Sequence, residues 1–298
     1  MIYSRKLLFR KNLTLAFVIA PAVLFAQENL DAQAKPAKEF VKGTFENGVV
    51  INNQTVENTR KKSLDFMIQH RFGVIKDEKD FFGLFAPSNI RLGLTYGITN
   101  DLSVGIGATK NKYLFDLQGK YIIFKQTKQK GIPVTVTYYG DVAKSARDND
   151  LFLNQEGEYK VTNKLSYFHE LMIARKINSK ISLQLAATYS YFNIIDSVYA
   201  QHEFYGVSFV GRYRFSPQSS VIVDFDYLLN VSGIEETTRP KPNLSIGYEV
   251  STGSHQFQIF ICTADGIINQ ENRVFNHNEI SERDFMLGFN ITREWGFK

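Results

Sequence analysis

The segment that ends the chain, Asp284 to Phe297, alternates between two kinds of residue almost without a break. Large apolar side chains hold one set of alternate positions, and small or polar side chains hold the other, with Arg293 as the exception. Because successive side chains of a β-strand point to opposite faces, the pattern predicts a strand with one apolar and one polar face. A terminal strand with an aromatic end is typical of outer-membrane β-barrels, whose aromatic residues gather at the membrane interfaces.

The N-terminal residues have the composition of a secretory signal peptide. Four basic residues precede an apolar run, Leu13 to Phe25, which is too short to span a membrane as a helix. We predict a signal peptide over residues 1–26, cut after Ala26. Its removal lowers the formal net charge from +5 to +1. The basic charge that would favour a nucleic-acid partner is therefore mostly that of the signal peptide, and we expect no such partner. The single cysteine, Cys262, excludes an intrachain disulfide and metal sites built on several cysteines. We expect no metal and no cofactor.

Residues 63–298 contain about twelve segments of strand length that are separated by alternating short and long connections. Short turns on one side and long loops on the other are the outer-membrane pattern. A soluble β-sandwich stays open as an alternative, but nothing in that fold requires short and long connections to alternate. The fold class predicted is all-β: a single antiparallel transmembrane β-barrel with short periplasmic turns and longer extracellular loops. The predicted strands are 63–73, 89–99, 101–110, 113–125, 132–142, 162–176, 178–192, 202–215, 218–230, 242–251, 254–264 and 282–297.

Residues 27–62 alternate little, and we interpret them as a periplasmic leader segment. Asn47-Gly48 predicts a tight turn there. Two arrangements of the leader stay open, a short hairpin or a piece that enters the barrel mouth.

The polar faces of the strands carry charges of both signs, and a charge facing lipid would cost about 2–4 kcal/mol for Arg or Lys at the midplane. We therefore expect these side chains to face the lumen. They could pair with one another across a narrow, partly filled lumen, which we favour for most of them, or line a selective pore. The lumen-facing candidates are Asp65, Arg71, Arg91, Asp116, Lys120, Arg212, Arg214, Asp224, Asp226, Glu249 and Glu294. The candidate interface aromatics are Tyr96, Tyr189, Trp295 and Phe297.

Several segments resemble a family of Bacteroidota outer-membrane barrels known as domain of unknown function 5777. The similar segments include Leu64 to Gly73 (LDFMIQHRFG), Phe81 to Phe85 and Asn89 to Gly107. The resemblance covers most of the chain after the signal peptide. It implies a membrane β-barrel in a Gram-negative cell and carries no agreed activity. In this family an acidic residue often stands near Phe85, where this chain has Phe85-Ala86, so the resemblance does not support a ligand site in that loop.

Three functions remain open for such a barrel. The first is a narrow channel or small-solute conduit in the cell outer membrane, and the second is a closed scaffold or receptor whose loops at 143–161 and 265–281 contact a periplasmic or surface protein. The third is an outer-wall lipid hydrolase built on His70 or His169, but no nucleophile motif accompanies either, so we expect no enzyme. Expected partners are outer-membrane lipid and, through the C-terminal strand, the barrel assembly machinery. We expect a monomer.

Overall fold

The computed structural model describes residues 39–297 except positions 77, 78, 80, 82, 130, 197, 198, 200, 232 and 237. The predicted signal peptide and residues 27–38 of the predicted leader lie outside the described residues. No helix in this part of the chain is long and apolar enough to cross a membrane.

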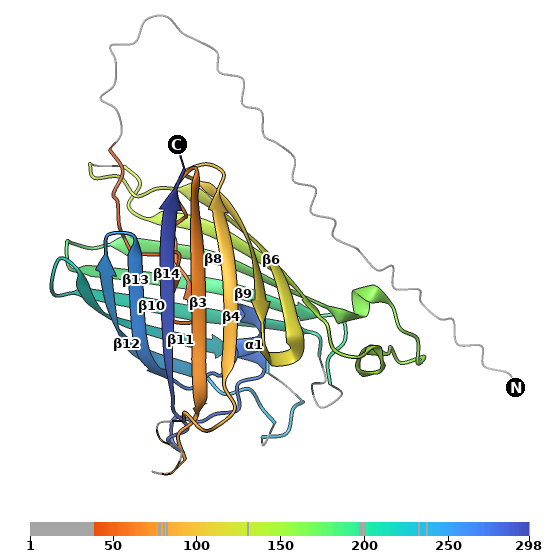
Figure 1. The fold of residues 1–298 in the computed structure, drawn as a ribbon. Coiled ribbons are helices and arrows are strands. Elements are labelled where there is room, and N and C mark those ends of the chain that lie inside the picture. Colours follow the sequence, from red (N-terminus) through yellow and green to blue (C-terminus); the bar gives the residue numbers. More distant parts are fainter. Residues whose placement is uncertain are drawn as a thin grey trace, which may run out of the picture. The chain divides into compact units, whose positions relative to one another are not determined.

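Twelve antiparallel strands form a closed barrel, in which each strand pairs with its neighbours in sequence and the last pairs with the first (Figure 1). The closing pair is β14 with β3, where Trp295 lies opposite Leu64. The predicted fold class is therefore confirmed, and strand bounds differ from the prediction by at most four residues. The strands are β3 (Ser63–Val74), β4 (Asn89–Gly97), β5 (Leu102–Thr109), β6 (Leu114–Phe124), β7 (Thr135–Ser145), β8 (Leu165–Lys176), β9 (Ile181–Phe192), β10 (Glu203–Arg214), β11 (Ser219–Leu228), β12 (Asn243–Thr252), β13 (His255–Cys262) and β14 (Met286–Gly296).

The two ends of the barrel differ in their connections. Strand β3 begins and β14 ends at the turn end, which carries short links such as 177–180, 215–218 and 253–254. The opposite end, called the loop end below, carries the long segments 146–164, 229–242 and 263–285. Short helices lie in connections at the loop end: η2 (Asn111–Tyr113), η3 (Asn149–Phe152), η4 (Val161–Lys164) and α1 (Asn269–Val274).

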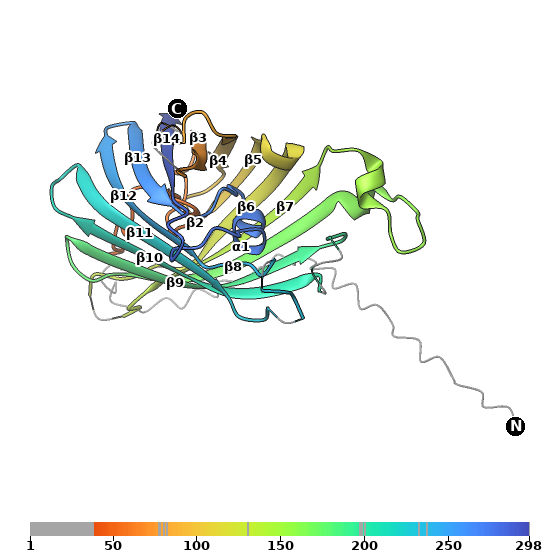
Figure 2. The ribbon, with the colours of Figure 1, turned by 90° about the horizontal axis from the view of Figure 1, so that it is seen from below.

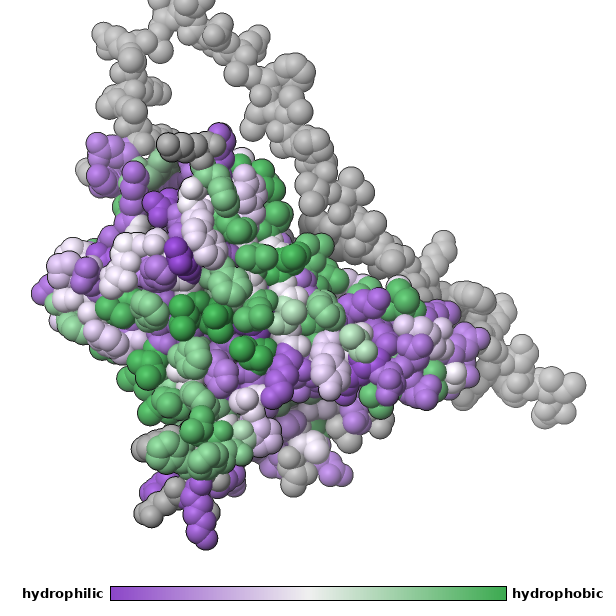
Figure 3. Space-filling model, viewed as in Figure 1, coloured by the Kyte–Doolittle hydropathy of each residue, from purple (hydrophilic) through white to green (hydrophobic). Residues whose placement is uncertain are grey.

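The outer wall is apolar because the alternate residues of each strand that face outward are large and hydrophobic. Leu117, Leu185 and Ile106 keep 61%, 65% and 56% of their surface exposed. A soluble protein rarely leaves so many such side chains in contact with water, whereas lipid accepts them. Figure 3 shows hydrophobic residues gathered over the strands and hydrophilic residues over the projecting loop region.

The barrel is not empty. A two-stranded hairpin, β1 (Val49–Val50) and β2 (Asn53–Gln54), belongs to a separate small sheet, and Figure 2 shows it inside the ring of strands. The hairpin turns at Ile51-Asn52, where Ile51 has a positive φ of 53°. The tight turn predicted at Asn47-Gly48 is therefore wrong. Gly48 instead accepts a hydrogen bond from the Thr55 amide (2.9 Å) at the base of the hairpin, so these residues extend the ladder that the turn closes.

Candidate functional site

Residues 43–62, called the inserted segment below, enter the lumen from the turn end and return there to begin β3. Wall side chains accept hydrogen bonds from backbone amides of this segment. Gln258 Oε1 lies 3.1 Å from the Ile51 nitrogen, and Asp224 Oδ2 lies 2.9 Å from the Asn52 nitrogen. On β9, Gln184 accepts from the Val56 amide at 3.0 Å. The wall thus satisfies backbone groups that would be costly to bury unpaired.

Arg71 of β3 holds the turn of the hairpin. Its side chain is fully buried, and Nη2 donates to the carbonyl of Ile51 at 3.0 Å and to Asn52 Oδ1 at 2.9 Å. Nη1 donates to Asn290 Oδ1 of β14 at 3.0 Å, and the guanidinium lies 4.4 Å from the centre of the Phe260 ring. A buried guanidinium needs such a full set of acceptors to offset the loss of hydration.

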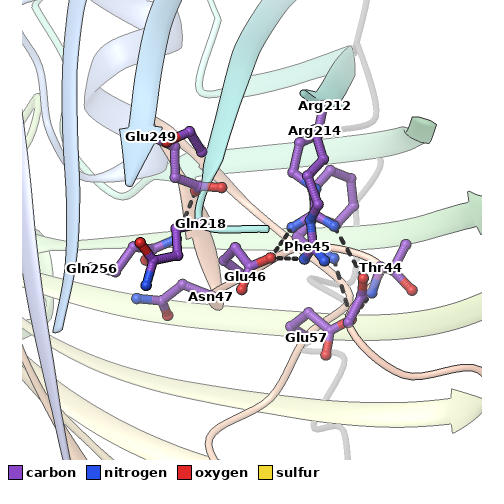
Figure 4. A network of polar contacts seen from close by, with 12 residues as sticks. Thr44, Phe45, Glu46, Asn47, Glu57, Arg212, Arg214, Gln218, Glu249 and Gln256 are labelled. Carbon is purple, nitrogen blue, oxygen red and sulfur yellow. Dashed lines mark hydrogen bonds and ion pairs between the residues drawn. The ribbon is translucent and has the colours of Figure 1, made fainter. Parts of the chain in front are cut away.

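Glu46 forms the main charged contact between the inserted segment and the wall (Figure 4). Its Oε1 lies 2.8 Å from Nη1 of Arg212 and also pairs with Arg214, the next inward position of β10. Arg212 donates a second bond to the carbonyl of Gly43 at 3.1 Å, and only 1% of its side chain is exposed. Across the lumen, Lys120 donates to the carbonyl of Gly48 at 2.8 Å.

The inserted segment also packs through apolar side chains. Phe45, Val50, Ile51 and Val56 are all at least 99% buried in one cluster. The wall side chains of that cluster include Phe168, Met172, Ile222 and Phe260. Full burial of one such side chain is worth about 1.5–3 kcal/mol, so the segment is held firmly.

A second element fills the lumen from the loop end. All six residues of α1 are buried, and Figure 2 shows this helix within the ring of strands. Arg273 forms ion pairs with Asp226 at 2.9 Å and with Glu170 at 3.8 Å, and it donates to Asn53 of the hairpin. The predicted contact loop 265–281 is therefore wrong over α1, because this part lies against the wall rather than at the surface.

The cavity that remains beside the inserted segment is small. The cavity between the inserted segment and strands β3 to β7 has a volume of about 40 Å³, room for a few waters. Larger pockets of 390, 470 and 620 Å³ open at the loop end, and each is lined in part by residues of segment 263–285. The inserted segment and α1 thus occupy the middle of the barrel.

The predicted lumen residues all point inward, and most meet one of the two inserted elements. Arg91 and Asp116 instead pair with each other at 2.9 and 2.5 Å. Near the turn end, Asp65 accepts from Thr59, Glu294 pairs with Arg60 at 2.7 Å, and Glu249 accepts from Gln256 and Gln258 of the neighbouring strand.

Four charged residues inside the barrel escaped the sequence prediction. Asp141 and Glu170 face the lumen and contact α1 through Gln270 and Arg273. The alternation of polar and apolar residues along β7 and β8 could have identified Asp141 and Glu170. For Glu170 the alternation was ambiguous, because the consecutive residues Tyr167 and Phe168 are both apolar. Glu46 and Arg273 lie outside the barrel strands, so periodicity carries no signal for them.

The candidate interface aromatics point outward. Tyr96 and Phe297, at the turn end, are 40% and 54% exposed. Trp295 lies close to them, with the guanidinium of Arg293 5.1 Å from the centre of its ring. Tyr189 lies toward the loop end, with its ring centre 5.2 Å from that of Tyr205.

The loop end contains an aromatic group beside its 470 Å³ pocket. Tyr199 packs edge-on against Phe275 at 5.3 Å, and its hydroxyl lies 3.0 Å from Nε2 of His277. Burial raises the pKa of Tyr199 to about 12 and lowers the pKa of His277 from 6.5. Both rings are therefore neutral at physiological pH.

Residues 45–295 match the family model described as "Membrane bound beta barrel domain (DUF5777)". The chain belongs to this family. The match begins within the inserted segment, so the family domain includes the hairpin as well as the barrel. The family and the even-stranded, antiparallel barrel place the protein in the outer membrane.

Several solved barrel structures are similar to the chain at low sequence identity. An outer membrane channel from Pseudomonas putida F1 is 12% identical, with 83% of this chain and 100% of the other covered and a TM-score of 0.52. The NanC porin is 10% identical (79% and 99% covered, TM-score 0.47), and the KdgM porin is 8% identical (79% and 99% covered, TM-score 0.45). No curated protein sequence matches the chain.

The histidines considered for a hydrolase lie on the outer wall. His70 stacks on Phe289 with ring centres 5.0 Å apart, and Nδ1 of His169 lies 2.6 Å from the hydroxyl of Tyr138. Among the described residues, neither histidine forms a hydrogen bond with a serine hydroxyl, and no group of three or more His, Cys, Asp or Glu side chains could hold a metal ion.

Proposed function

We propose that this family barrel is a small-solute conduit that is closed at rest by its own inserted segment and narrowed by α1. The observation that carries the proposal is the polar inner wall, to which every strand contributes at least one buried polar side chain. One from each strand, β3 to β14 in order, is Arg71, Arg91, Ser103, Asp116, Thr137, Glu170, Gln184, Ser208, Asp224, Ser245, Gln258 and Asn290.

A polar wall suits a lumen that is filled with water for part of the time. Hydrogen bonds between wall and inserted segment can be exchanged for bonds to water, since each contributes only about 0.5–1.5 kcal/mol net. A permanent filling could instead rest on an apolar wall, like the core of a soluble protein. The apolar cluster around Phe45 and Ile51 keeps the segment in place at rest, so we expect opening to require a trigger.

Planar-bilayer recordings test this proposal. The full chain should show little conductance, and a variant lacking residues 43–58 should show discrete conductance steps, because Thr59 to Lys62 still lead into β3. Heat-modifiable migration on unboiled gels establishes that each barrel is folded. If the deletion variant is folded and conducts no more than the full chain, the conduit is excluded.

A second candidate is a closed receptor that acts through its loops. The filled lumen and the exposed apolar side chains of loop 146–164, such as Leu151 and Leu153, favour it. If the protein is such a receptor, replacing residues 149–160 with a Gly-Ser linker should abolish co-purification of its partner. The variant lacking residues 43–58 should then show no conductance. An unchanged set of bound proteins after the replacement would contradict it.

We further propose that the protein has no hydrolase activity. His70 and His169 engage aromatic neighbours, as interface side chains do, and their ring contacts explain their positions without chemistry. A fluorogenic phospholipid should be turned over no faster by the wild type than by His70→Ala. A loss of turnover in the variant would contradict the proposal.

A further inference from the structure

We propose that the opened lumen passes cations in preference to anions. The inference rests on the proposed conduit and concerns its substrate class. It derives from the charges that the wall keeps when the inserted segment has left.

Inward-facing acids outnumber inward-facing bases on the twelve strands, all of which the structure describes. Eight carboxylates face the lumen against six cationic side chains. Carboxylates that line a water-filled lumen are ionised at neutral pH. The acids are Asp65, Asp116, Asp141, Glu170, Asp224, Asp226, Glu249 and Glu294, and the bases are Arg71, Arg91, Lys120, Lys176, Arg212 and Arg214.

The excess of acids is concentrated in the middle of the barrel. Counted along each strand from the turn end, five carboxylates lie at this level, with only two wall cations, Arg71 and Arg91. Arg91 is already held by one of the five, Asp116, through two hydrogen bonds. The four other carboxylates of this layer are Asp141, Glu170, Asp224 and Asp226.

The acidic layer coincides with the place where α1 narrows the lumen. Gln270 of α1 donates to Asp141 at 2.9 Å, and Arg273 pairs with Asp226 and Glu170. Arg273 is itself a cation tethered among these carboxylates, and it neutralises only part of their charge. Because a charged ring at a constriction decides which ions pass, this layer should set the selectivity.

The turn end carries the opposite balance but has no comparable constriction element once the segment has left. Arg212, Arg214, Lys120 and Lys176 lie there with Asp65, Glu249 and Glu294. In the closed state, Glu46 of the inserted segment pairs with two of these cations. The layer around α1 therefore remains the part of the path where acids prevail and space is least.

Reversal potentials in a tenfold KCl gradient test the inference on the variant lacking residues 43–58. We expect the K⁺ to Cl⁻ permeability ratio to lie clearly above 1, because a ring of acidic side chains favours cations. Glu170→Gln combined with Asp226→Asn leaves three carboxylates against Arg71, Arg91 and Arg273 in this layer, so the ratio should fall to about 1. Asp148→Asn with Asp150→Asn, in an exposed loop, removes the same charge and should leave the ratio unchanged.

Each result supports or overturns the inference. A ratio at or below 1 in the deletion variant, or an equal fall with the loop control, overturns cation preference while the conduit stands. A folded deletion variant without conductance overturns the conduit and the inference with it. If the deletion variant does not fold, the rare openings of the full-length Glu46→Gln variant provide the same measurement.

Discussion

Replacing Glu46 by Gln should release the inserted segment more often. The carboxylate pairs with Arg212, which is 1% exposed, and with Arg214. A hydrogen bond to a charged group contributes about 1.5–3 kcal/mol, and the carboxamide at position 46 keeps one acceptor, so we expect a loss of about 2 kcal/mol. Because 1.4 kcal/mol corresponds to a factor of ten, the open fraction should rise roughly 30-fold.

Cysteine labelling measures this open fraction. Val50 is fully buried, so Val50→Cys in a Cys262→Ser background reacts with a membrane-impermeant maleimide only when the segment leaves the lumen. When the segment opens and closes faster than the reagent reacts, the labelling rate is proportional to the open fraction. Adding Glu46→Gln should therefore raise the rate by the same factor.

Glu39→Gln is the matched control for this experiment. Glu39 pairs with Lys128 at 3.0 Å, but both side chains are more than half exposed. Exposed pairs contribute about 0–1 kcal/mol, so this variant should label at most about fivefold faster. If Glu46→Gln labels no faster than Glu39→Gln, the contact of Glu46 with the wall does not hold the segment, and the reasoning is refuted.

Three further perturbations test other contacts. Arg273→Gln leaves Asp226 in the lumen without its ion pair and should cost about 3–5 kcal/mol, lowering the temperature at which the folded gel form is lost, whereas the exposed Arg239→Gln should not. Gly97→Ala places a methyl group 1.9 Å from the Arg60 carbonyl oxygen, so it should also lower the temperature at which the folded gel form is lost. Gly119→Ala is the control, because nothing lies within 4 Å of its added methyl group. Equal effects of the two variants would contradict the predicted clash. Burial lowers the pKa of His277, so its neutral ring stabilises the loop end above pH 6.5, and this contribution is lost as the pH falls through the lowered value; an NMR titration midpoint at or above 6.5 would contradict this.

The barrel was predictable from sequence because side chains along a β-strand alternate between its two faces with a period of two residues. In β14, the alternation of Phe289 and Ile291 against Asn290 and Thr292 assigns one face to lipid and the other to the lumen. The same rule places Arg71 and Asp224 inside. The partners of these side chains were not predictable, since Arg71 binds backbone oxygen of Ile51, which every residue type carries.

The inserted elements follow a different logic, which explains why sequence patterns missed them. Residues 269–274 read as an ordinary polar loop, yet all six are buried, because polar wall groups such as Asp141 and Asp226 give them partners. Polarity normally predicts exposure. Inside a polar lumen, polar residues are buried instead. Loop 265–281 was therefore assigned to the surface, although α1, which is part of it, lies inside the barrel.

The side chains that bind the turn of the hairpin lie where the first and last strands pair to close the barrel. Arg71 comes from the first strand and Asn290 from the last; they bond to each other at 3.0 Å, and both donate to the carbonyl of Ile51. Neither β3 nor β14 alone presents this pair of donors, so the pair is assembled only when the barrel has closed. The two bonds to the Ile51 carbonyl therefore form together only in the closed barrel. Weakening the hairpin should then change the labelling of position 50 while leaving a folded, heat-modifiable barrel.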